Sequence, residues 1–267
     1  MLRLIFSLTA IGVLTLALLP FQAVAVWLDL PLKRRIPAFF HRTICRILDI
    51  RLRVIGRCIT EHPLLIVANH SSWLDIPVIT AVAPVVFVAK QEIAGWPLFG
   101  LLAKLQRTVF VDRTRRHKTR DVNAEIAQRL AGGDPVVLFG EGTSSDGNRV
   151  LAFRSALIGS ARDALAEAEH TGRVWIQPLS LAYTRMHGLP LGRRDRPRVA
   201  WYGHMSLAPH LARIARGAGI DVTVIWGEPV AFEEQSDRKQ VARALESAVR
   251  RRTIAALRGS PDPSQPA

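Results

Sequence analysis

The sequence predicts an α/β protein: a mostly parallel mixed sheet flanked by helices, preceded by an N-terminal membrane-associated helical segment. Beyond residue 50, short apolar runs rich in β-branched residues alternate with segments of helical periodicity. This alternation is typical of a largely parallel sheet covered on both faces. Before residue 50, a long uncharged run precedes a basic segment. We therefore expect a membrane-anchoring and amphipathic region over residues 1–50, one α/β domain over residues 51–258 and a disordered tail over residues 259–267.

The N-terminal run from Leu4 to Leu28 contains no charged residue over 25 positions. A helix of that length covers the roughly 30 Å hydrocarbon core of a bilayer, although Pro20 allows either a tilted span or a half-inserted segment. The alternative is a cleaved signal peptide, because Ala23–Ala25 fits a small-x-small cleavage site. Arg3 alone precedes the run and several basic residues follow it. This bias predicts the inner (cytoplasmic) membrane, with the α/β domain on the cytoplasmic face.

Residues 36–48 carry apolar side chains at three- and four-residue steps, with basic side chains between them. The pattern predicts a basic amphipathic helix that lies in the membrane interface, packs on the body of the protein, or does both. The formal net charge of +14 also indicates an anionic partner. Beside an apolar N-terminus we expect that partner to be the lipid bilayer and not nucleic acid. The two cysteines, Cys45 and Cys58, do not have metal-ligand spacing, and we expect no metal.

Apolar runs and helical periodicity place the elements of the α/β domain in order along the chain. The expected strands cover residues 52–55, 64–68, 85–89, 109–111, 136–139, 174–181, 199–201 and 222–226. The expected helices cover residues 73–82, 96–105, 114–130, 152–169, 207–215 and 237–257.

The most informative segment follows the apolar strand that ends at Ala68, where Asn69, His70 and Asp75 occur together. In open α/β sheets, ligands bind where strands end and helices begin. Within one regular helix, residues five apart are separated by about 140°, so His70 and Asp75 can meet only if His70 precedes the helix. Asp75 could then fix the imidazole tautomer and leave the other ring nitrogen as a base. A histidine that merely caps the helix is the alternative for this pair taken alone.

Three further segments accompany this pair. Lys90 opens a glycine-marked segment that leads to Asp112-Arg113, the run from Phe139 to Ser144 ends another apolar strand, and Pro178 lies within a third. Together the four segments, in this order over residues 63–182, resemble the blocks of the glycerolipid acyltransferases, the family that contains 1-acyl-glycerol-3-phosphate acyltransferase.

The resemblance implies transfer of a fatty acyl group from an acyl carrier protein or coenzyme A thioester to a lysolipid hydroxyl, without a cofactor or a metal. It implies catalytic roles for His70 and Asp75, with His70 as the general base. The base is needed because an alcohol does not attack a thioester unaided. Acceptor-binding roles fall on Lys90, Glu141, Gly142, Thr143 and Ser144. Site-supporting roles fall on Asn69, Asp112, Arg113, Phe139 and Pro178.

Two positions depart from the family pattern. Gly140 stands where the family has proline, which indicates a local backbone change. Ser144 stands where phosphate-accepting members carry an arginine that is understood to bind the acceptor phosphate. With the segment from Arg198 to Met205, this departure resembles the bacterial lyso-ornithine lipid acyltransferases, whose acceptor has no phosphate. The alternative is an enzyme that still makes phosphatidic acid.

Functions of other classes fit the sequence less well. A serine lipid esterase would require a Gly-x-Ser-x-Gly elbow, which the sequence lacks. A non-catalytic basic membrane-binding protein would explain the charge but not the pairing of His70 with Asp75 at a strand end.

Overall fold

The computed structural model describes residues 1–112, 119–159 and 173–260. The strands of these residues form one nine-stranded sheet in the order β1-β8-β6-β2-β5-β3-β4, with β7 and β9 paired to β6. Five of the strand pairings are parallel: β1–β8, β2–β6, β2–β5, β3–β5 and β3–β4. Strand β6 runs antiparallel to β7, β8 and β9. The mostly parallel mixed sheet is therefore confirmed. The strands are β1 (Ile50–Ile55), β2 (Leu64–Ala68), β3 (Val86–Lys90), β4 (Val109–Val111), β5 (Val136–Phe139), β6 (Val174–Met186), β7 (Leu189–Pro190), β8 (Ile220–Trp226) and β9 (Val230–Phe232).

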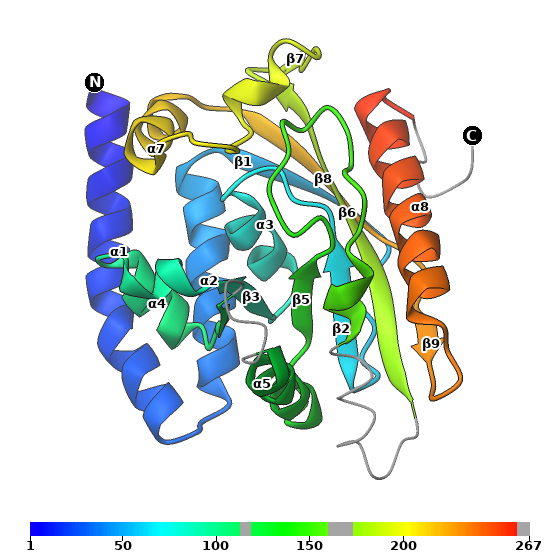
Figure 1. Ribbon diagram of the computed structural model, residues 1–267. Coiled ribbons are helices and arrows are strands. Elements are labelled where there is room, and N and C mark those ends of the chain that lie inside the picture. The colour runs from blue at the N-terminus through cyan, green and yellow to red at the C-terminus, as the bar shows by residue number, and fades with distance from the viewer. Residues whose placement is uncertain (113–118, 160–172, 261–267) are drawn as a thin grey trace.

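Helices cover both faces of the sheet, and Figure 1 shows α8 on one side and α2 and α3 on the other. The α-helices are α1 (Leu2–Trp27), α2 (Leu32–Ile47), α3 (Asp75–Val82), α4 (Phe99–Leu105), α5 (Thr119–Ala131), α7 (Leu207–Arg216) and α8 (Arg238–Leu257). Short 3-10 helices lie at η1 (Gln91–Gly95), η3 (Ser155–Ile158) and η4 (Arg196–Arg198).

Strand β2 shows how the sequence produces this two-sided core. All five of its residues are buried, and successive side chains point to opposite faces of a sheet. Leu64 and Ile66 join the apolar cluster under α2, α3 and α7, whereas Leu65 and Val67 join the cluster under α5 and α8. A continuous apolar run in the sequence thus becomes a central strand that is covered on both faces.

Helix α1 packs along α2 and α7. Ser7, Thr15 and Gln22 are buried, while Phe6 and Phe21 are 65% and 66% exposed. The Gln22 amide donates to the carbonyls of Lys33 and Leu105 at 3.1 and 2.7 Å. Among the described residues, α1 is the one helix long and apolar enough to cross a membrane. Its apolar face is directed away from the body of the protein.

Helix α2 is the predicted amphipathic helix, and it packs on the body of the protein. Ile44 and Cys45 are buried in the core, whereas Phe39 is 52% exposed. At its N-terminal end, Arg34 binds the buried carboxylate of Asp134 at 2.7 Å, and Arg107 pairs with the same carboxylate. This ion-pair cluster joins α2 to the segments that precede β4 and β5.

Several predicted boundaries differ from the structure. The strand expected at residues 199–201 is wrong: Val199 and Ala200 donate to the carbonyl of Arg196, so the chain turns there after η4. Helix α3 begins at Asp75, because the loop before it is held by side-chain bonds. Of the expected 152–169 helix, the described part contains the short η3, and residues 160–169 lie outside the described residues, as do residues 114–118 of another expected helix. Strands β7 and β9 were not predicted, since each has only two or three residues.

Candidate active site

The site begins where β2 ends, between its two parallel neighbours β5 and β6. The amide of Asn69 donates to the Leu181 carbonyl at 3.0 Å and accepts from the Leu181 N–H at 2.8 Å. Because β2 pairs with β6 up to Ala68, this side chain continues the ladder in place of a backbone. On the other side, the Gly140 N–H donates to the Ala68 carbonyl at 2.9 Å. The loop that carries His70 therefore leaves the sheet in a fixed direction.

His70 and Asp75 meet because the former lies in this loop and the latter opens α3. The Nδ1 atom of His70 lies 2.7 Å from Oδ2 of Asp75. The same oxygen accepts the backbone N–H groups of Ser71 and Ser72 at 2.8 and 3.0 Å. Asp75 is fully buried, and the imidazole is 19% exposed. An acceptor-only carboxylate at Nδ1 requires a proton on that nitrogen, which leaves Nε2 as the basic atom.

Aromatic stacking fixes the plane of the imidazole. The His70 ring stacks on Phe139 with centroids 3.9 Å apart and planes 17° apart. Phe139 ends β5 and stacks in turn on Phe87 of β3. The ring of His70 is thus held by a hydrogen bond at one edge and by a packed face on one side.

Glu141 holds the loop of His70 from the neighbouring strand end. It is 2% exposed, and its two oxygens accept the N–H of His70 at 2.8 Å and the N–H of Leu151 at 3.0 Å. Burial raises the pKa of this carboxyl to about 7, aided by the charge of Asp75 and opposed by the two N–H donors and Arg250. Both oxygens of Glu141 contact backbone, so the geometry is that of a brace. A direct contact with an acceptor stays a prediction.

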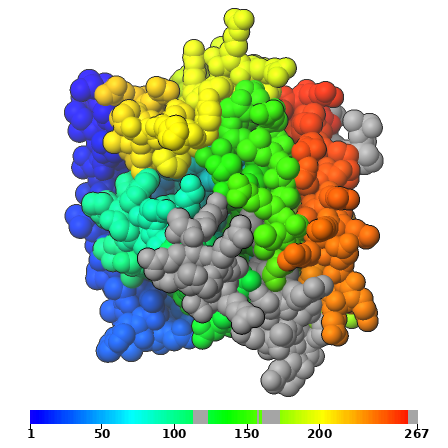
Figure 2. All heavy atoms as spheres, viewed as in Figure 1, coloured from blue at the N-terminus to red at the C-terminus, as the bar shows by residue number. Residues whose placement is uncertain are grey.

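The residues that follow Glu141 differ in burial and in their hydrogen bonds. Gly142 is buried with φ of 67°, a conformation that favours glycine, and its N–H donates to the Phe139 carbonyl at 2.9 Å. Thr143 is exposed and Ser144 is half-buried. Ser145 donates to the His70 carbonyl through both its N–H and its hydroxyl, at 2.9 and 3.2 Å. Figure 2 shows a hollow on this face, between the teal surface of α4, the green segment after β5 and the yellow segment near α7.

The remaining predicted residues lie on or after other strands, and none has a hydrogen bond to the dyad that the structure records among the described residues. Lys90 is exposed at the end of β3, and Asp112 is half-buried after β4. Pro178 lies inside β6, paired with Val67 of β2, and its carbonyl accepts the Gly227 N–H at 2.8 Å. Arg113 lies outside the described residues.

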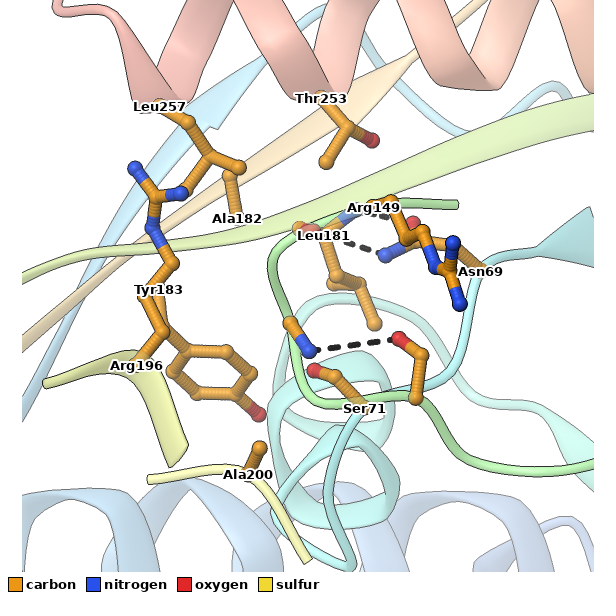
Figure 3. A pocket seen from close by; sticks show the side chains of 12 residues that line it. Asn69, Ser71, Arg149, Leu181, Ala182, Tyr183, Arg196, Ala200, Thr253 and Leu257 are labelled. Atoms are coloured by element: carbon orange, nitrogen blue, oxygen red, sulfur yellow. Dashed lines mark hydrogen bonds between the residues drawn. The ribbon is translucent and has the colours of Figure 1, made fainter. Parts of the chain in front are cut away.

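Sequence reasoning missed Tyr183, whose hydroxyl donates to Oδ1 of Asp75 at 2.7 Å. It lies near the end of β6, and no local spacing links it to Asp75. A narrow cavity borders the tyrosine, and Figure 3 shows Arg149, from the segment after β5, and Arg196, from η4, at this cavity. Among the described residues, no three His, Cys, Asp or Glu side chains are grouped to hold a metal ion.

Comparison with known proteins identifies the family. Residues 50–182 match the family model described as Acyltransferase. The chain is 49% identical over 257 residues to the lyso-ornithine lipid O-acyltransferase of Brucella abortus, with 96% of each chain covered. The chain belongs to the acyltransferase family. This acyltransferase is also 42% identical over 211 residues to the 1-acyl-sn-glycerol-3-phosphate acyltransferase of Neisseria meningitidis, covering 78% and 77% of the two chains.

A solved structure supports the fold of this acyltransferase. The 1-acyl-sn-glycerophosphate acyltransferase of Thermotoga maritima superposes with a TM-score of 0.62 at 22% identity, covering 96% of this chain and 95% of that one. The matched family region contains β2, β5 and the larger part of β6, and with them His70, Asp75 and Glu141.

Proposed function

We propose that this acyltransferase moves a fatty acyl group from an acyl carrier protein or coenzyme A thioester to the free hydroxyl of a lysolipid. The observation that carries the proposal is the 2.7 Å contact between a partly exposed imidazole and a fully buried carboxylate. Nε2 of His70 takes the hydroxyl proton as the lysolipid oxygen bonds to the thioester carbonyl carbon. Collapse of the tetrahedral intermediate breaks the carbon–sulfur bond, and the imidazolium returns the proton to the thiolate. Asp75 stabilises the imidazolium between the two steps.

We propose lyso-ornithine lipid as the acceptor. Ser144 stands at the position of the family's phosphate-binding arginine, and a serine hydroxyl lacks the charge and the paired donors that bind a dianionic phosphate. The Brucella relative, which is similar to this protein over nearly the whole chain, is named for this acceptor. The alternative acceptor is 1-acyl-sn-glycerol-3-phosphate, for which the Neisseria relative is named.

Helix α1 and the basic segment after it support membrane attachment. The Gln22 side chain of α1 bonds to the protein, while large apolar side chains such as Phe6 and Phe21 are exposed. A helix held along its length by the domain would carry that domain into the bilayer if it crossed fully. We therefore propose a half-inserted α1, with the domain on the cytoplasmic face of the inner membrane, where the positive-inside bias places the basic segment.

The experiment compares the purified protein with its His70→Ala variant in mixed micelles. Each is given acyl carrier protein or coenzyme A thioester and one of the two lysolipids. We expect acyl transfer to lyso-ornithine lipid by the wild type and none by the variant. A clear preference for 1-acyl-sn-glycerol-3-phosphate would overturn the acceptor, and full activity of the variant would overturn the base.

The same experiment tests the alternative function of another class, that of a non-catalytic membrane-binding protein. Such a protein would bind vesicles and transfer no acyl group with either acceptor. Release of free fatty acid without any lysolipid would instead indicate a thioester hydrolase.

A further inference from the structure

Tyr183 contacts the side of Asp75 that faces away from His70. Oδ2 of Asp75 is occupied by Nδ1 of His70 and by two backbone N–H groups. Oδ1 accepts the phenol of Tyr183 at 2.7 Å. The carboxylate is therefore held from both oxygens, one bound to the base and the other bound to a tyrosine 108 residues away in the sequence.

Strand β6 places this phenol with little freedom. Tyr183 is 6% exposed and joins the same apolar cluster as Leu179 and Leu181, which lie on the same face of the strand. The pairing of β6 with β8 shifts register between Tyr183 and Arg185. Such irregularities occur beside active sites, where they redirect a side chain. Tyr183 thus reaches past the end of β2, where Asn69 has already joined the strand to β6.

The environment keeps the phenol protonated, so that it can act as a donor. Burial raises the pKa of Tyr183 well above its ordinary value, and the charge of Asp75 raises it further. The other ionisable groups that act on this cluster are Cys45 of α2, which affects Tyr183, and Glu141 after β5, which is affected by Asp75.

We infer that Tyr183 is a positioning residue that sets both the orientation and the charge distribution of Asp75 for the proposed reaction. The phenol fixes the carboxylate plane so that Oδ2 stays directed at Nδ1. It also withdraws charge from the carboxylate, which tunes how strongly Asp75 stabilises the imidazolium. Without the phenol, Oδ1 becomes a buried acceptor with one fewer donor, and the carboxylate is freer to rotate. This inference rests on the proposed acyl transfer.

The test removes the phenol alone, with Tyr183→Phe, and uses Tyr202→Phe as the matched control, since Tyr202 is the chain's other tyrosine. We expect Tyr183→Phe to lower kcat roughly tenfold with little change in the KM of the lysolipid. The acid limb of the kcat/KM–pH profile should move to higher pH, because Asp75 then carries more charge toward the imidazole. Tyr202→Phe should change neither.

A second measurement keeps the inference testable if Tyr183→Phe does not fold. In the Tyr202→Phe background, biosynthetic 3-fluorotyrosine labels position 183 alone and makes its phenol a stronger donor of nearly the same size. The acid limb should then move to lower pH, opposite to the effect of phenylalanine. An unchanged profile in both proteins, with wild-type transfer intact, overturns the role of Tyr183 alone. Absence of transfer by the wild type instead overturns the proposed function.

Discussion

The ring of Phe153 packs over the α-carbon of Gly140 so closely that a β-carbon there would lie 2.6 Å from its Cδ2 atom. Gly140 also uses both backbone groups: its N–H donates to the Ala68 carbonyl at 2.9 Å and its carbonyl accepts the Arg154 N–H at 2.8 Å. Glycine in place of the family's proline therefore leaves room for the Phe153 ring and supplies the N–H that bonds to β2.

Gly140→Pro should destabilise the protein by about 2 to 4 kcal/mol, because proline adds atoms against Phe153 and removes the N–H donated to Ala68. Denaturant unfolding in detergent measures the change. The double variant Gly140→Pro with Phe153→Ala should relieve the steric part and leave the hydrogen-bond part. A Gly140→Pro variant as stable as the wild type would contradict this explanation of the glycine.

Asp75→Asn should lower kcat by roughly 10³-fold or more, because an amide carries no charge to stabilise the imidazolium and can hold the wrong tautomer. Steady-state transfer assays measure this loss. Sedimentation with anionic vesicles should be unchanged, because Asp75 is fully buried and presents no surface to a vesicle. Retained turnover would show that the base does not depend on the charge of Asp75.

Glu141 should make stability depend on pH. Its pKa in the folded protein, about 7, lies above its ordinary value of 4.5. The folded state therefore keeps a proton that the unfolded chain releases. The resulting stabilisation is fully present below pH 4.5 and is lost as the pH rises through 7, a change on the order of 3 kcal/mol.

Glu141→Gln removes this titration, and unfolding free energies at pH 5 and pH 8 provide the measurement. The difference between the two pH values should shrink in the variant relative to the wild type. The variant should also lose activity. In the wild type both oxygens of Glu141 accept a backbone N–H, and in the variant the amide nitrogen, itself a donor, would face one of these N–H groups. Equal pH dependence in both proteins would mean that Glu141 does not titrate in this range.

Asp134→Asn should destabilise the protein by about 3 kcal/mol, because it leaves the guanidinium groups of Arg34 and Arg107 without their buried counter-charge. Burial already lowers the pKa of Arg107 to about 10. Asp29→Asn is the matched control: its side chain is 84% exposed, so the loss of its pair with Lys33 should change stability far less than the loss of the Asp134 carboxylate. Chemical denaturation of both variants tests the difference.

Phe6→Glu combined with Phe21→Glu should release the protein from vesicles, because the two charges lie on the exposed apolar face of α1. Flotation with liposomes measures the bound fraction. Leu189→Glu, which charges an equally exposed residue of β7, is the control and should leave binding unchanged. Binding of the double variant at the wild-type level would contradict membrane attachment through α1.

Local patterns in the sequence predicted most of the elements. The apolar run of β2 and the uncharged run of α1 form a strand and a helix at the expected positions. Burial on two faces demands the continuous apolar residues of β2. The predicted strand at residues 199–201 was wrong because the prediction relied on apolar residues alone. Val199 and Ala200 are buried, and burial alone does not distinguish a strand from a buried turn.

The sequence by itself indicated that His70 precedes the helix that contains Asp75, because their separation allows contact in that arrangement alone. It did not reveal Tyr183, nor that Glu141 braces the loop of His70 from 71 residues away. Those contacts exist because β2 lies between β5 and β6, so three strand ends meet at one edge of the sheet. Strand order is decided by the packing of the whole chain. The periodicity of a single segment does not indicate which strands pair with it in the sheet.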